Sequence, residues 1–119
     1  MQHTARHLTT EMQHCIDSCI ESHGMCEETI TYCLQQGGEH ASATLIRALT
    51  DCADICRMCA DMMMRDSDFS GAMCGLCADV CLRCAEECGR MDADQQMMSC
   101  AETCRRTADM CRQMAGARA

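Results

Sequence analysis

Cysteine is the residue type whose number and spacing in this sequence indicate chemistry. The chain has 15 cysteines among 119 residues, and neighbours within each segment are three, four or seven positions apart. Residues at these separations share one face of an α-helix. Four groups of cysteines therefore predict four helices with thiols along one side: Cys15, Cys19, Cys26 and Cys33; Cys52, Cys56 and Cys59; Cys74, Cys77, Cys81, Cys84 and Cys88; Cys100, Cys104 and Cys111.

Thiols at this spacing favour a soft metal ion of low coordination number. The Cβ atoms of residues three or four apart on a helix are about 5–6 Å from each other, so two sulfurs can converge on one ion. Thiolate and thioether ligands together select Cu(I). Zinc prefers a closed set of four ligands, commonly from loops, and iron–sulfur runs commonly end in proline, which this chain lacks. Binding of zinc or cadmium stays open as an alternative.

Charge balance predicts how many ions such an interior would hold. Many ionised thiolates buried together would be very unfavourable unless each charge is compensated. One monovalent ion per thiolate cancels the charge, so we expect on the order of a dozen or more Cu(I) ions per chain with bridging sulfurs. Each thiol that binds should release about one proton. Without metal, the neutral thiols would pack as small hydrophobic groups, so the helices should form before copper arrives.

Disulfides and thiol redox catalysis are the other uses of cysteine to consider. The odd number of cysteines excludes complete pairing within one chain, and neighbours on one helix are poorly oriented for a disulfide. A redox enzyme would use Cys56-x2-Cys59 or Cys74-x2-Cys77 and would need an exposed thiolate of lowered pKa. Fifteen thiols exceed that need, so we expect no enzyme, with the redox protein kept as a further alternative.

The elements that must position these thiols are four helices in one domain, residues 1–119. Gly37 and Gly38 interrupt the first helix. Thr10 with Gln13 and Asp92 with Gln95 have capping-box spacing, and Ser67–Asp68 offers a further cap. Short connections make consecutive helices antiparallel neighbours, which predicts an all-α, up-down-up-down four-helix bundle with a cysteine-lined core. The expected helices span about 10–36, 42–66, 69–89 and 93–114.

Composition limits the partners and the location. The formal net charge is −8, and aromatic residues make up 2% of the chain, so we expect no nucleic-acid partner. No apolar run is long enough to span a membrane. The first residues lack the features of a signal peptide, which predicts a cytoplasmic protein.

The positions of methionine and histidine predict an entrance for metal ions at one end of the bundle. The proposed topology brings together the starts of the first and third helices and the ends of the second and fourth. Met12 and Met63 continue the cysteine phase at that end, and Met73 lies on its flank. Thioethers bind Cu(I) without losing a proton, so these residues could pass ions inward, although methionine also fills gaps in ordinary cores.

Histidines add further candidate ligands. His14 belongs to the same end, and His23 lies four residues after Cys19, on the flank of the thiol face. His3 and His7 precede the first helix. The opposite end carries Leu45, Leu49 and Met97 and is expected to be closed by apolar side chains.

The motifs Cys52-x3-Cys56-x2-Cys59 and Cys74-x2-Cys77-x3-Cys81-x2-Cys84-x3-Cys88 resemble the bacterial copper storage proteins, which are cysteine-rich four-helix bundles. The similarity covers residues 12–114, and the lack of an export signal resembles the cytosolic branch. The resemblance implies storage of many Cu(I) ions, a ligand role for the cysteines, a homotetramer, and copper uptake at one end past methionine or histidine. Ser22 and Thr107 stand where further cysteines would fit. A copper chaperone or a small chelating thiol is the expected delivery partner.

Overall fold

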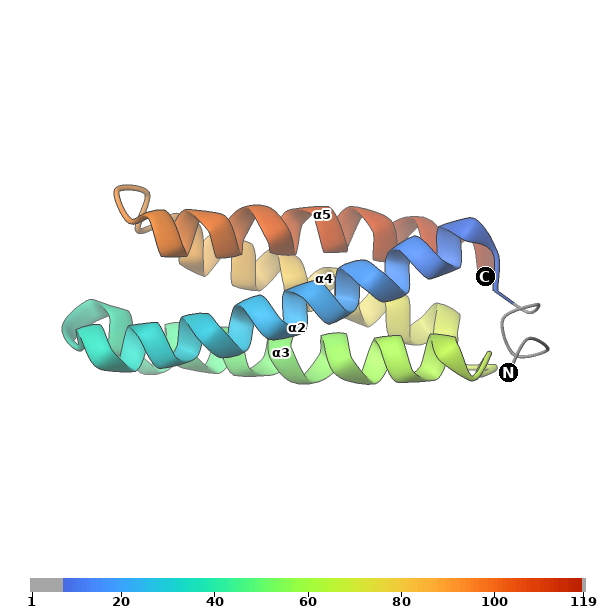
Figure 1. Ribbon diagram of the computed structural model, residues 1–119, viewed down its shortest axis with the longest axis horizontal. Coiled ribbons are helices and arrows are strands. Elements are labelled where there is room, and N and C mark those ends of the chain that lie inside the picture. The colour runs from blue at the N-terminus through green and yellow to red at the C-terminus, as the bar shows by residue number, and fades with distance from the viewer. Residues whose placement is uncertain (1–7, 119) are drawn as a thin grey trace.

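The computed structural model describes residues 8–118, which form four α-helices and no strand (Figure 1). The predicted all-α bundle is therefore confirmed, and the last helix continues four residues beyond its expected end at residue 114. The elements in chain order are α2 (Thr10–Gln36), the 3-10 helix η1 (Gly38–Ala41), α3 (Ala43–Met64), α4 (Ser70–Gly89) and α5 (Gln95–Arg118).

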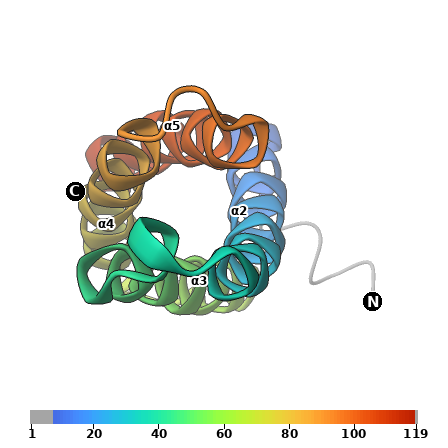
Figure 2. The same ribbon diagram turned by 90° about the vertical axis from the view of Figure 1, so that its left-hand side faces the viewer.

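The helices form a closed ring when viewed along the bundle (Figure 2). Each helix packs against the next in the chain, and α5 packs against α2 to complete the ring. Within the described residues, the diagonal pairs α2–α4 and α3–α5 make no close backbone approach. The four helices therefore enclose a long interior, which their inward-facing side chains fill.

Local capping sets where the helices begin and end. The hydroxyl of Thr9 accepts a hydrogen bond from the Met12 N–H at 3.1 Å, so α2 is capped one residue earlier than the predicted Thr10. It ends at Gly37, whose φ of 71° favours glycine and whose N–H donates to the Cys33 carbonyl at 3.1 Å. Ser42 caps α3 through its hydroxyl, which accepts the Leu45 N–H at 3.3 Å.

Two predicted caps differ from the structure. Asp94, and not Asp92, caps α5, because its Oδ1 accepts the Met97 N–H at 3.1 Å. The Ser67 hydroxyl accepts the Phe69 N–H at 3.1 Å within the turn before α4, and the cap residue Phe69 makes no side-chain capping bond. Adjacent polar residues offer equivalent local caps, so sequence alone does not decide between them.

Alanine residues permit close helix packing beside the thiols. Three helices each carry a buried pair of alanines seven residues apart, and every one directly follows a core Cys or Thr. Small side chains where two helices meet let the helices approach closely, and the Cys or Thr before each alanine then points into the interior. These alanines are Ala53 and Ala60 in α3, Ala78 and Ala85 in α4, and Ala101 and Ala108 in α5.

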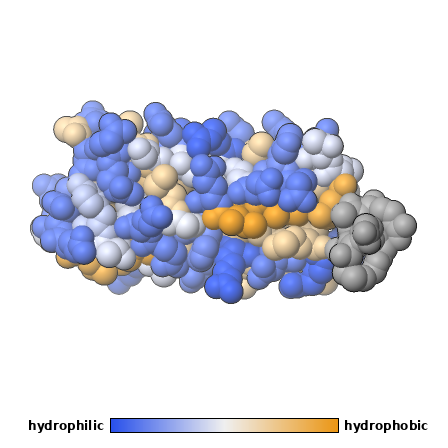
Figure 3. Space-filling model, viewed as in Figure 1, coloured by the Kyte–Doolittle hydropathy of each residue, from blue (hydrophilic) through white to orange (hydrophobic). Residues whose placement is uncertain are grey.

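The outer surface is mainly polar. Figure 3 shows one hydrophobic strip on the displayed face, which follows the first half of α2. Ile20 of α2 is 51% exposed, whereas Ile16 is buried in the core. None of the helices in residues 8–118 has the length and hydropathy needed to cross a membrane.

Candidate metal centre

Helical periodicity places every cysteine inside the bundle. All fifteen are free thiols, and each has 0% of its surface exposed. Alternation of three- and four-residue steps keeps each row of sulfurs on the inner face of its helix, because a helix turns once per 3.6 residues. The predicted cysteine-lined core is therefore present in the structure.

Eleven of these thiols form three clusters, in each of which all Sγ atoms lie within 4.8 Å of one another. The first cluster takes one thiol from each of the four helices, the second takes its thiols from α2, α4 and α5, and the third from α3 and α4. Their members are Cys19, Cys59, Cys77 and Cys111; Cys26, Cys84, Cys100 and Cys104; and Cys52, Cys56 and Cys81.

Short sulfur–sulfur contacts join the clusters into one network. Cys56 of the third cluster lies 3.8 Å from Cys77 of the first. Cys52 of the third cluster lies 3.8 Å from Cys104 of the second. The third cluster therefore bridges the other two along the α3–α4 side of the interior, so an ion bound at one cluster has further thiols within reach.

Sulfur contacts extend the network toward both ends. Near the start of α2, Cys15 Sγ lies 3.7 Å from Cys111 Sγ. Cys74 Sγ lies 3.6 Å from Cys59 Sγ and 3.7 Å from the Met63 Sδ atom. We call this the methionine end, because Met12 and Met63 are buried there.

Sequence reasoning missed a similar contact at the opposite end, which we call the η1 end. Cys33 donates a hydrogen bond to the Met97 Sδ atom at 3.6 Å, and Met97 is fully buried. Met97 was expected only as an apolar plug. Its separation of three residues from Cys100 on α5 was the available signal, because that spacing continues the thiol face.

Hydrogen bonds between thiols shift pKa values in opposite directions within the clusters. Bonds with Cys111 and Cys19 lower the pKa of Cys59 to about 5, and bonds with Cys104 lower the pKa of Cys52 and of Cys100. Each cluster thus contains a thiol whose thiolate is stabilised by its neighbours.

Other thiols are held in the neutral form. Bonds with Cys52 and Cys56, together with burial, raise the pKa of Cys81. Burial, with smaller effects of nearby Cys100 and Asp94, raises the pKa of Cys33 to about 11. Metal binding at these positions must displace a proton.

The wall between α2 and α5 is closed by hydroxyl groups. Thr107 Oγ1 lies 2.7 Å from Ser18 Oγ and 2.5 Å from Ser22 Oγ, and it also donates toward the Thr103 and Ser18 carbonyls, each at 3.1 Å. Ser22 and Thr107 are fully buried. The two positions that lack the expected cysteines therefore form a hydrogen-bonded seam.

A polar group closes the η1 end. Asp94 Oδ2 accepts a hydrogen bond from the Tyr32 hydroxyl at 2.6 Å and lies 2.9 Å from His40 Nε2. The Tyr32 and His40 rings also meet edge to face, with centroids 5.8 Å apart. These contacts tie the end of α2 and η1 to the start of α5.

The structure places the predicted histidine ligands outside the thiol interior. His14 is exposed and lines a groove between α2 and α5. His23 lines a groove between α2 and α3, and its Nδ1 atom lies 2.8 Å from the Ala53 carbonyl. Met73 is half-buried and lines a third groove, between α3 and α4. His3 and His7 lie outside the described residues.

A helical bundle filled with free thiols in groups of three and four is a container for soft metal ions. A redox enzyme would require an accessible thiolate, whereas both thiols of the Cys56/Cys59 and Cys74/Cys77 motifs are fully buried. The fold and the site therefore define a metal-holding bundle.

The family model for copper storage proteins matches residues 8–116. The chain therefore belongs to the copper storage protein family. The comparison with curated proteins found no match.

Solved structures of this fold align over nearly the whole chain. The Cu(I)-bound copper storage protein BsCsp3 is 37% identical, with a TM-score of 0.83 over 89% of this chain and 99% of that one. A protein of Nitrosospira multiformis is 37% identical, with a TM-score of 0.85 over 90% and 96%. The copper storage protein Ccsp of Streptomyces lividans, loaded with 10 copper equivalents, is 27% identical, with a TM-score of 0.77 over 89% and 84%.

Proposed function

We propose that this protein stores Cu(I) inside its bundle and thereby limits copper toxicity, with no substrate turnover. The observation that carries the proposal is the burial of all fifteen thiols, eleven of them in three clusters already assembled within 4.8 Å. Soft thiolate ligands in a preformed, water-excluding interior favour Cu(I). Relatives of the same fold that hold Cu(I) or copper support this assignment.

The fifteen cysteines are the proposed ligands, and loading should approach one Cu(I) per thiol, or about fifteen ions per chain, because that ratio cancels the thiolate charge. Met63 and Met12 are proposed as additional donors at the methionine end, and Met97 at the η1 end. We propose no interior role for His23 or Met73, since both line outer grooves.

Zinc, or the similar ion cadmium, is the second candidate cargo. The first and second clusters each hold four sulfurs within 4.8 Å, which is the ligand number of a closed tetrahedral zinc site. The third cluster has three thiols, and its sulfurs contact both others. Zinc storage would therefore fill about two complete sites and leave other thiols without metal.

The wider setting is proposed from the relatives and the surface. We propose a single domain over residues 1–119 that acts in the cytoplasm, because the Streptomyces lividans relative is a cytosolic copper storage protein. We further propose a homotetramer, with the hydrophobic strip on α2 as a contact surface (Figure 3). A copper chaperone or a small chelating thiol would deliver or remove the ions.

Anaerobic titration of the reduced protein tests the cargo. Cu(I) should be taken from a competing chelator to about fifteen equivalents per chain, whereas Zn(II) should saturate near two. Cys81→Ser would be compared with the surface variant Ser99→Ala, and only the first should reduce the copper capacity. Saturation with Cu(I) at two or three equivalents, or tighter retention of zinc than of copper, would reject Cu(I) storage.

A further inference from the structure

We infer that His14 and Met110 form a site on the outer wall of the bundle that acquires Cu(I) and transfers it to the Cys15–Cys111 pair inside. This route passes between α2 and α5, and not through the methionine end. The inference rests on the proposed function, because it supplies the cargo that the thiol network stores.

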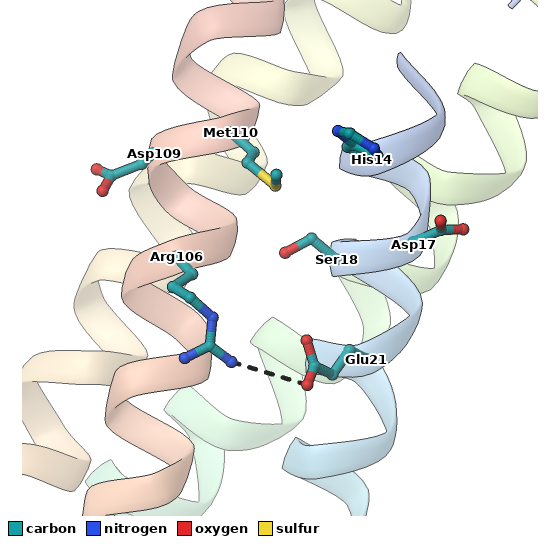
Figure 4. A pocket seen from close by; sticks show the side chains of 7 residues that line it. All are labelled: His14, Asp17, Ser18, Glu21, Arg106, Asp109 and Met110. Atoms are coloured by element: carbon teal, nitrogen blue, oxygen red, sulfur yellow. Dashed lines mark ion pairs between the residues drawn. The ribbon is translucent and has the colours of Figure 1, made fainter. Parts of the chain in front are cut away.

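The two side chains belong to a groove of about 410 Å³ between α2 and α5. Figure 4 shows the Met110 thioether extending from α5 across the groove toward α2, with the His14 ring on the opposite wall. Thioether and imidazole groups both bind copper, and neither is ionised when it binds. The lining residues are His14, Asp17, Ser18, Glu21, Arg106, Asp109 and Met110.

The outer pair lies next to a buried pair of thiols along both helices. His14 directly precedes Cys15, and Met110 directly precedes Cys111. The sulfurs of Cys15 and Cys111 are fully buried and 3.7 Å apart. The outer pair and the inner pair are therefore carried by the same turns of the same two helices, on opposite sides of one wall.

Small polar groups form the wall between α2 and α5 one helical turn further along the same groove. The Ser18 hydroxyl lies on the groove side, where Figure 4 shows it pointing toward α5, and it bonds Thr107 at 2.7 Å. The groove has no aliphatic residue among its lining. By contrast, Ile20 lines the groove between α2 and α3, and Leu76 and Val80 line the groove between α3 and α4.

Charge also favours a cation in this groove. Three carboxylates, on Asp17, Glu21 and Asp109, belong to its lining against one guanidinium, and Figure 4 shows those of Asp17 and Asp109 at its outer edges, pointing away from the space between the helices. That guanidinium, on Arg106, lies 3.7 Å from Glu21 and is thus partly neutralised. An excess of negative charge raises the local concentration of cations.

The groove between α2 and α3 offers a matched comparison. It also contains a histidine and a methionine, His23 and Met64, but its charges are one Arg57 and one Asp61. The His23 Nδ1 atom is already 2.8 Å from a backbone carbonyl. Met64→Leu is therefore the control for Met110→Leu.

The proposed transfer is a ligand exchange without redox chemistry. Copper arrives and remains as Cu(I). Its bonds to the His14 nitrogen and the Met110 sulfur break as bonds to Cys15 and Cys111 form. Each thiol that becomes a thiolate loses its proton to water.

The test measures the rate at which Cu(I) moves from a colourimetric Cu(I) chelate to the reduced protein in stopped flow. Met110→Leu and His14→Gln should each slow the initial uptake by roughly tenfold, the lower part of the range for loss of a group that supports metal binding. Met64→Leu should leave the rate unchanged. All three variants should reach the same final copper capacity.

A second measurement detects the site itself. After the thiols are filled, a further addition of Cu(I) should shift the ¹³C-methyl resonance of Met110 and the ring resonances of His14, and Met110→Leu should abolish the histidine shift. Unchanged uptake in Met110→Leu, equally slow uptake in Met64→Leu, or no shift at His14 would overturn the inference. Normal final loading in these variants would leave Cu(I) storage intact. Failure of the wild-type protein to load would overturn both.

Discussion

The hydroxyl seam between α2 and α5 leads to a specific prediction about stability. Thr107→Val keeps the shape of the side chain but removes the oxygen that Ser18 and Ser22 both contact. The exposed edge near Ser18 admits water, whereas Ser22 is fully buried and would keep only the Thr103 carbonyl at 3.5 Å. This single long bond leaves the Ser22 hydroxyl poorly satisfied, and an unsatisfied buried hydroxyl costs about 1–3 kcal/mol. We therefore expect Thr107→Val, which also removes the bonds of Thr107 itself, to lower the free energy of unfolding by about 2 kcal/mol.

Adding Ser22→Ala to Thr107→Val should restore part of the lost stability. Ser22→Ala alone leaves Thr107 bonded to Ser18 and to backbone carbonyls, so it should cost about 1 kcal/mol or less. In the double variant no hydroxyl remains at residue 22, and replacing both partners of a hydrogen bond by apolar groups is nearly neutral. The double variant should therefore be more stable than Thr107→Val by about 1 kcal/mol.

Urea unfolding of the reduced, metal-free protein, followed by far-ultraviolet circular dichroism, measures these differences. The two single variants and the double variant complete a double-mutant cycle. Equal Cu(I) capacity in all four proteins would show that the seam is structural. Additive losses, with the double variant less stable than Thr107→Val, would refute the proposed orphaned hydroxyl.

Three further predictions concern the ends of the bundle and its metal-free state. Met97→Leu should change stability by less than about 1.5 kcal/mol but weaken Cu(I) retention at Cys33, measured by chelator competition. Tyr32 and His40 lower the pKa of Asp94. The stability that the Asp94 carboxylate contributes is therefore present above its unfolded pKa near about 4, and it is lost as pH falls through the lower folded pKa. Between pH 5 and pH 3, the urea midpoint of Asp94→Asn should fall less than that of wild type. Removal of copper by a strong chelator should leave the helical circular dichroism signal unchanged, since free thiols already fill the interior.

Local periodicity explains how much of the fold could be predicted. Steps of three, four and seven residues determine a face of a helix whatever surrounds it, and all fifteen cysteines are on the inner faces. The same geometry explains why the histidines lie in outer grooves and not among the thiols. His14 precedes Cys15 by one residue, and one step rotates a side chain about 100° around the helix axis, which directs the ring to an outer groove.

Which thiols of different helices come together could not be predicted from the sequence. It depends on the axial offset of each helix relative to its neighbours, which the turns and core packing determine together. Cys52 and Cys56 meet Cys81 of α4, whereas Cys59 joins a cluster that has members from all four helices. The spacing of Met97 from Cys100 places it on the thiol face, but its contact with Cys33 depends on how the end of α2 lies beside the start of α5.

The spacing of the sulfurs bears on how copper would be arranged in this interior. With a metal–thiolate distance of about 2.3 Å, two sulfurs in line with one ion would be about 4.6 Å apart. Three sulfurs around an ion would be about 4.0 Å apart at the same bond length, and four about 3.8 Å apart. The contacts between Cys56 and Cys81, at 3.5 Å, and between Cys52 and Cys104, at 3.8 Å, are closer to the separations for three or four sulfurs around an ion than to the linear one. Sulfurs shared between ions therefore require less separation of the helices than isolated linear pairs, and they also allow the one-to-one ratio that charge balance demands.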